Sequence, residues 1–112
     1  MSTTPAKYDD TIQRRDVYDM ILKFQDSTEK NMVLTGWTVS SEIWDQARTT
    51  KYATFSVSYT DRNNGKVVLS LTSDQTTALP DKCYYDVLLT DPSGKKEYYL
   101  EGVFYVSQGY TT

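Results

Sequence analysis

The segment from Lys66 to Val106, KVVLSLTSDQTTALPDKCYYDVLLTDPSGKKEYYLEGVFYV, carries most of the information about the fold. Its first part, residues 66–71, alternates apolar with mixed side chains, which is typical of a strand with one buried face. Thr72 or Ser73 can accept hydrogen bonds from N–H groups two or three positions on, and Asp74 favours a helix start, so we expect one helical turn over 73–79. Pro80 then ends that turn, because proline cannot continue a helix.

The second part of this segment predicts two strands joined by a tight turn. Apolar residues alternate from Cys83 onward, and Asp91-Pro92-Ser93-Gly94 is a turn because proline fixes φ and glycine allows positive φ. Together the two strands supply most of the expected core: Cys83, Tyr85, Val87, Leu89, Tyr98, Leu100 and Phe104.

The first half of the chain supplies the other strands. Period-two alternation runs over 17–24, 37–43 and 53–60, and the turn 61–65 closes a hairpin onto the Lys66 strand. The sequence therefore predicts an all-β fold, an immunoglobulin-like antiparallel β-sandwich of about seven strands with one short helical turn. We expect an N-terminal arm over 1–14, the sandwich domain over 15–106 and a C-terminal tail over 107–112.

Composition excludes several classes of function. The formal net charge is −3, with basic and acidic residues interspersed, so no basic stripe suggests nucleic-acid binding. No apolar run is long enough to span a membrane, and the first thirty residues lack the order of a signal peptide, which favours synthesis and assembly in the cytosol. The chain has no histidine, so an enzyme would lack the usual general base.

No cofactor or metal is expected. The segment Asp61 to Gly65 lacks the ligand spacing of a calcium loop and reads better as a hairpin turn. The single cysteine, Cys83, cannot form an intrachain disulfide, and its position in the alternation predicts a buried thiol.

The two tryptophans are seven residues apart, so on one uninterrupted strand they point to opposite faces. Trp37 shares a face with Val39 and is the core candidate. Trp44 shares a face with Glu42 and should lie outside. It is either a contact anchor, as exposed tryptophans at interfaces often are, or a residue that folds over the rim of the sandwich after the strand ends.

The outward faces carry many apolar and aromatic residues, and we expect part of them to form a protein–protein interface. A loop or the N-terminal arm of the same chain could instead cover these residues. Val17 and Ile21 are outward on an early strand, and Tyr8 lies in the arm. The candidate interface residues are Trp44, Tyr84, Leu88, Tyr99, Val103, Tyr105 and Tyr8.

Residues Arg14 to Val106 resemble the small immunoglobulin-like domains of tailed-bacteriophage virion proteins, which occur at the N-termini of upper-baseplate and tail-fibre proteins or as short stand-alone proteins. The resemblance is sharpest in Leu34-Thr35-Gly36, Gly65 to Leu71, Leu79-Pro80 with Tyr85-Asp86, and Leu100-Glu101-Gly102. This chain has Asp81-Lys82 where many such domains have a glycine, and no long fibre segment follows Val106.

The resemblance implies a non-enzymatic structural protein of the virion, present in several symmetric copies at the tail, baseplate or fibre-attachment region and contacting other virion proteins. A capsid decoration protein or the base of a head fibre is the closest alternative. A carbohydrate-binding adhesion module, with Trp44 and the tyrosines stacking on host glycan, is an alternative of another class.

Overall fold

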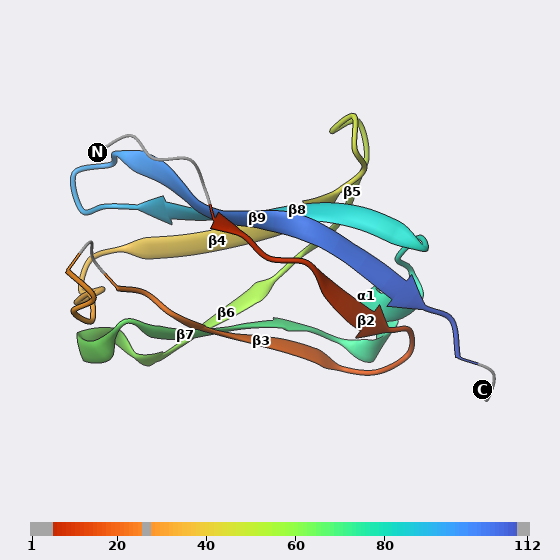
Figure 1. The fold of residues 1–112 in the computed structure, drawn as a ribbon, viewed down its shortest axis with the longest axis horizontal. Helices are drawn as coiled ribbons and strands as arrows, with labels where there is room; N and C mark the ends of the chain where they lie inside the picture. Colours follow the sequence, from red (N-terminus) through yellow and green to blue (C-terminus); the bar gives the residue numbers. More distant parts are fainter. Residues whose placement is uncertain (1–5, 26–27, 110–112) are drawn as a thin grey trace.

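A computed structural model describes residues 6–25 and 28–109 of the chain. The elements of these residues follow one another as β1 (Ala6–Lys7), β2 (Asp10–Gln13), β3 (Tyr18–Lys23), β4 (Thr38–Trp44), β5 (Lys51–Thr54), β6 (Ser56–Asp61), the 3-10 turn η1 (Arg62–Asn64), β7 (Lys66–Leu71), α1 (Ser73–Thr77), β8 (Lys82–Thr90) and β9 (Lys96–Ser107). Figure 1 shows the strands in two layers.

The larger sheet has the strand order β1-β9-β8-β4-β5, with β2 also pairing with β9. The smaller sheet has the order β3-β7-β6. All pairs are antiparallel except those of β1 and β2, which run parallel to β9. The structure thus confirms an all-β two-sheet sandwich with one short helical turn.

The expectation of an arm over 1–14 is wrong for residues 6–13. These residues form β1 and β2, which pair with the outer edge of β9 from Leu100 to Ser107. Ile12 is fully buried in the core. The segment is polar and its two strands are short, so it has no periodicity to indicate a strand; the long β9 supplies the edge that it needs.

The stretch 53–60, expected to be one strand, is divided between the sheets. β5 ends at Thr54 in the larger sheet, and β6 begins at Ser56 in the smaller one. Between them Phe55 is buried, and its N–H donates to the Ser41 carbonyl at 3.0 Å. Because the chain continues to point alternate side chains inward as it crosses, the sequence pattern does not reveal the crossover.

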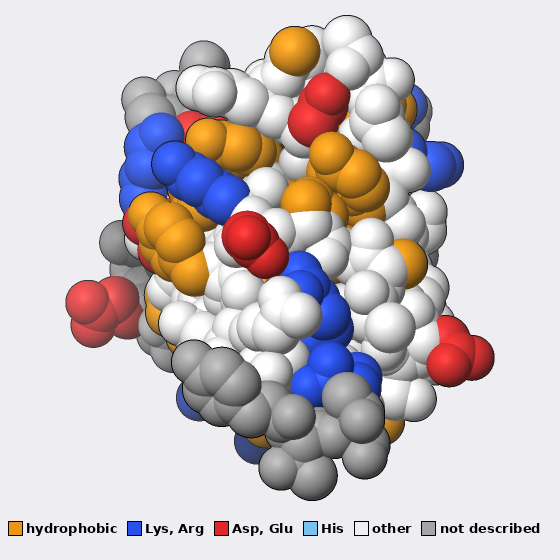
Figure 2. Space-filling view, turned by 90° about the vertical axis from the view of Figure 1, so that its right-hand side faces the viewer, with side chains coloured by type: hydrophobic (Ala, Val, Ile, Leu, Met, Phe, Trp, Pro, Cys, Tyr) orange, Lys and Arg blue, Asp and Glu red, His pale blue; other side chains and the backbone are white. Residues whose placement is uncertain are grey.

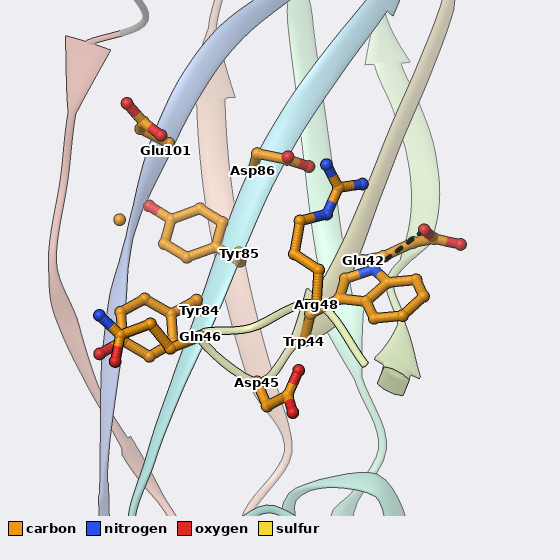
Figure 3. A pocket seen from close by; sticks show the side chains of 10 residues that line it. Glu42, Trp44, Asp45, Gln46, Arg48, Tyr84, Tyr85, Asp86 and Glu101 are labelled. Carbon is orange, nitrogen blue, oxygen red and sulfur yellow. Dashed lines mark hydrogen bonds between the residues drawn. The ribbon is translucent and has the colours of Figure 1, made fainter. Parts of the chain in front are cut away.

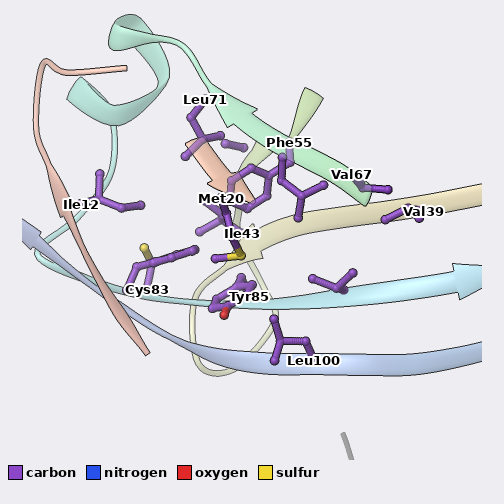
Figure 4. Packing of buried hydrophobic residues seen from close by; sticks show 14 of the residues in the cluster. Ile12, Met20, Val39, Ile43, Phe55, Val67, Leu71, Cys83, Tyr85 and Leu100 are labelled. Carbon is purple, nitrogen blue, oxygen red and sulfur yellow. The ribbon is translucent and has the colours of Figure 1, made fainter. Parts of the chain in front are cut away.

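The core lies between the sheets and consists mainly of aliphatic residues around a group of aromatic rings (Figure 4). Phe104 is fully buried, stacks on Tyr85 at 4.2 Å between ring centroids and meets Tyr18 edge-on at 5.4 Å. Cys83 is fully buried, as predicted, and Trp37 packs partly buried against the core, on the face that its alternation indicated.

The connections follow the expected turn chemistry. Thr72 caps α1, and its hydroxyl and the Gln75 side chain each bond to the other's backbone N–H. Gly94 takes a φ of +94° in the β8–β9 turn, where the Asp91 carboxylate accepts from the Ser93 and Lys95 N–H groups. Figure 2 shows the end of the sandwich near α1, where acidic, basic and apolar side chains are interspersed.

Candidate functional site

The solvent-facing side of β4, β8 and β9, here called the outer face, brings together most of the predicted interface residues. The strand register places them in cross-strand rows. Trp44 lies opposite Tyr84, which lies opposite Val103. Leu88 lies between Ser40 and Tyr98, and Tyr105 lies opposite Lys82.

Tyr99 is not on this face, and its predicted exposure is wrong. The β8–β9 register shifts so that Val87 pairs with Leu100 but Leu88 pairs with Tyr98, which leaves Tyr99 as an extra residue in a bulge. The Tyr99 ring packs edge-on against Phe24, with centroids 4.6 Å apart.

The same bulge corrects the prediction for Tyr98. We expected Tyr98 in the core, but it is 45% exposed on the outer face. A bulge reverses the inward–outward order of every residue on one side of it, so the alternation read from Phe104 does not extend to Tyr98.

Trp44 ends β4 and lies on the sheet rather than beyond it. Its indole N–H donates to Glu42 Oε1 at 3.2 Å, and the guanidinium carbon of Arg48 lies 5.9 Å from the ring centroid. On the neighbouring strands, Lys82 Nζ lies 5.7 Å from the Tyr84 ring and 5.9 Å from the Tyr105 ring. The aromatic rings of this face therefore have charged neighbours at their edges.

A row of three carboxylates crosses the outer face beside the aromatic row. Glu42 lies opposite Asp86, and Asp86 lies opposite Glu101. Lysines pair with the outer two: Lys51 with Glu42 at 3.2 Å and Lys7 with Glu101 at 3.1 Å. The central carboxylate, Asp86, forms no ion pair with another residue of the described chain, although like charges directly opposite each other destabilise a sheet.

Burial raises the pKa of Asp86 above its usual value, and the neighbouring charges act in both directions. Arg48 lowers the pKa, while Glu42 and Glu101 raise it. Burial therefore opposes the ionisation of Asp86.

The β4–β5 loop positions Arg48. Asp45 accepts hydrogen bonds from the Thr49 N–H at 2.7 Å and from the Thr50 N–H at 3.2 Å, and the Thr49 hydroxyl also donates to it. These bonds lower the pKa of Asp45. Arg48 has a φ of +59°, which turns the chain so that its side chain lies over the sheet.

Loop and sheet together enclose a hollow of about 200 Å³ (Figure 3). Its lining combines aromatic and charged side chains, chiefly Trp44, Tyr84, Glu42, Asp86, Glu101 and Arg48. The acidic row and Arg48 were missed by the sequence reasoning. These carboxylates lie on three separate strands, and they become neighbours only through the strand register, which cannot be read from the sequence.

Tyr8, the remaining predicted residue, lies elsewhere. It follows β1 at the edge of the larger sheet and lines a groove against β3 rather than the outer face. Its backbone is held from two sides, because its N–H donates to the Glu101 carbonyl at 2.9 Å and its carbonyl accepts from the Tyr85 hydroxyl at 2.6 Å.

Other kinds of site have little support in the described part of the chain. Residues 6–25 and 28–109 contain no group of three acidic, cysteine or histidine side chains that could hold a metal ion. No helix in the same ranges is long and apolar enough to cross a membrane. Burial raises the pKa of the Cys83 thiol to about 11, so this thiol is protonated at neutral pH.

Comparison with solved structures finds the filamin domain of Lin-41, which superposes with a TM-score of 0.50 at 15% sequence identity, over 88% of this chain and 84% of that chain. At this level of identity the likeness concerns the fold alone, and it confirms an immunoglobulin-like, filamin-type β-sandwich. A scan against protein-family models and a search of curated proteins give no match.

Proposed function

We propose that the chain is a non-enzymatic structural protein of a bacteriophage virion, a β-sandwich assembly module at the tail, baseplate or fibre-attachment region. The family assignment rests on the sequence motifs. Residues of three of these motifs have a clear task in the fold: Leu34 is fully buried, Gly65 takes a φ of +70°, and Gly102 allows the Tyr8 carbonyl to approach β9. The motifs therefore support a common fold, and the outer face supports the assembly role.

The observation that carries the assembly role is the cross-strand row of Trp44, Tyr84 and Val103 with Tyr105 beside it. Tyr105 is 48% exposed, and Trp44, Tyr84 and Val103 are half-buried. Large aromatic residues that are rimmed by charges are typical of protein interfaces.

Incorporation into particles tests this role. The double substitution Trp44→Ser with Tyr105→Ser should leave the isolated domain folded, because both side chains lie outside the core, yet prevent the chain from joining the particle. Val33→Ser is the matched control, since Val33 is 56% exposed in the segment before β4. Wild-type incorporation of the double variant would refute the proposed interface.

The position in the virion is a separate question. A capsid decoration protein or a head-fibre base would use the same kind of surface, so the physics of the interface does not separate these from a tail location. Labelling the chain at its C-terminus and imaging intact particles distinguishes them, because the label would lie on the tail in the first case and on the head in the others.

A carbohydrate-binding module is the second candidate, favoured by the hollow beside Trp44 and Tyr84. Sugar rings stack on aromatic faces, while carboxylates such as Asp86 and a guanidinium such as Arg48 can bond to hydroxyl groups. A glycan array with the isolated domain tests this function. Binding that disappears in Trp44→Ala would support it, and an array without binding would exclude glycans of that set.

A further inference from the structure

β3 is an edge strand of the smaller sheet, with β7 on one side and no strand of the described chain on the other. The Phe24 N–H donates to the Gly65 carbonyl at 2.9 Å, directly across from it in the β3–β7 register. In an antiparallel pair, alternate residues direct both backbone groups to the partner. The N–H and C=O groups of Asp19, Ile21 and Lys23 therefore point to the open side.

This edge lacks two of the usual protections against pairing with another chain, a proline and a bulge. β3 contains no proline and pairs with β7 without a bulge over its whole length, Tyr18–Lys23. Ile21 at its centre is 79% exposed, the highest value among the large hydrophobic residues of the described chain. At Ile21, the backbone N–H and C=O groups and the side chain are therefore all open to solvent.

The charges on this edge are complementary to a second copy of the same edge. Asp19 and Lys23 flank Ile21 at equal distances and share its solvent face. If two β3 strands pair antiparallel about Ile21, each Asp19 lies opposite Lys23 of the second copy, which gives two symmetric ion pairs. A shift by two residues loses both pairs, and a parallel in-register arrangement places like charges side by side.

Space is available beside the edge. A groove of about 560 Å³ runs along the core side of β3, between that strand and the segment around Tyr8, with Tyr99 and Leu100 of β9 also lining it. Figure 1 looks onto this side of the sandwich, with β2 above β3. The described chain therefore leaves the open side of β3 uncovered.

We propose that two copies of the chain associate through β3, antiparallel and centred on Ile21, to form a continuous sheet with the order β6-β7-β3-β3-β7-β6. About six backbone hydrogen bonds join the two strands, two for each opposed pair of outward-pointing residues. This contact is on the other sheet from the outer face, so it does not depend on the proposed virion function.

A charge swap tests the register. In sedimentation equilibrium of the full chain at low salt, Lys23→Asp should weaken dimerisation about 30-fold or more, because it creates two pairs of opposed carboxylates. The double variant Asp19→Lys with Lys23→Asp should restore it to within about threefold of wild type. A monomeric wild type, or a double variant as weak as the single one, would overturn the proposal.

Cross-linking gives a second, independent readout. The Cα atoms of paired Ile21 residues should lie about 5.5 Å apart, within the range for a disulfide, so oxidised Ile21→Cys should form a covalent dimer. The native Cys83 is fully buried and does not interfere. Val33→Cys is the exposed control; cross-linking of Ile21→Cys no faster than this control contradicts the β3 pairing and would leave the edge open to a strand of another protein.

Discussion

Replacing Gly102 with alanine should destabilise the fold through a single contact. A Cβ at this position would lie 1.8 Å from the Tyr8 carbonyl oxygen and 3.0 Å from Cε1 of the Tyr85 ring. Ordinary contact begins near 3.4 Å, so the Tyr8 backbone must move by about 1.6 Å. At Gly102 the backbone of Tyr8 thus lies directly against β9.

The size of the effect follows from the bonds that this movement breaks. The Tyr8 N–H donates to the Glu101 carbonyl, and the Tyr8 carbonyl accepts from the Tyr85 hydroxyl. Burial raises the pKa of Tyr85, so its hydroxyl remains a donor that needs a partner. Two lost hydrogen bonds and one buried, unpaired hydroxyl give a loss of about 3–5 kcal/mol in the free energy of unfolding.

Urea denaturation of Gly102→Ala, Tyr85→Phe and the double variant measures both the loss and its cause. If the Tyr8 displacement breaks the Tyr85 bond, Tyr85→Phe should cost about 1 kcal/mol in the wild-type background but should raise stability in the Gly102→Ala background, because there it removes the buried, unpaired hydroxyl. Gly94→Ala is the control, because no atom of the described residues beyond its two chain neighbours lies within 4 Å of its Cβ position, and its φ of +94° is what opposes alanine. We expect a cost of about 1 kcal/mol there.

A Gly102→Ala variant that loses no more stability than Gly94→Ala would refute the close approach of the N-terminal segment to β9. Additive effects of Gly102→Ala and Tyr85→Phe would refute the hydrogen bond as its energetic consequence.

Three further predictions concern the bulge, the acidic row and the thiol. Tyr99→Ala should cost about 2 kcal/mol in urea denaturation because it exposes Phe24, whereas Tyr98→Ala should cost less than about 0.5 kcal/mol; equal costs would contradict the bulge. The pKa of Asp86 is higher in the folded state than in the unfolded state. Protonated Asp86 therefore stabilises the fold below the unfolded-state pKa, and this stabilisation is lost as the pH rises through the folded-state pKa. Asp86→Asn should therefore be more stable than wild type at pH 7 and equal to it at low pH, and a lower stability at pH 7 would contradict this. Cys83 should not react with a thiol reagent at pH 8 until the chain is unfolded in urea; rapid reaction of the folded protein would show that the core is open.

The fold class was accessible from the sequence because most strands keep strict alternation. Residues 66–71 and 82–90 alternate buried and less buried positions without interruption, as predicted. The structure differs from the prediction at two places, where the chain changes sheets or forms a bulge without any break in the sequence pattern. Phe55 passes from one sheet to the other in phase, and the Tyr99 bulge reverses the faces within β9.

The candidate site was predictable only in part, for a related reason. The outward positions of Trp44, Tyr84, Val103 and Tyr105 follow from alternation within single strands. Their assembly into one surface depends on which strands are neighbours and in which register, which is set by long-range packing. Asp86 illustrates this, because its place in a row of three carboxylates is decided by β4 and β9 rather than by its own strand.

The most direct test of the proposed role is an electron-microscopy reconstruction of an intact phage particle that contains this chain, at a resolution that resolves side chains. The account predicts the sandwich in several symmetric copies, with Trp44, Tyr84 and Val103 covered by a neighbouring virion protein. A particle that lacks the chain, or one in which the outer face is turned to solvent in every copy, would contradict it.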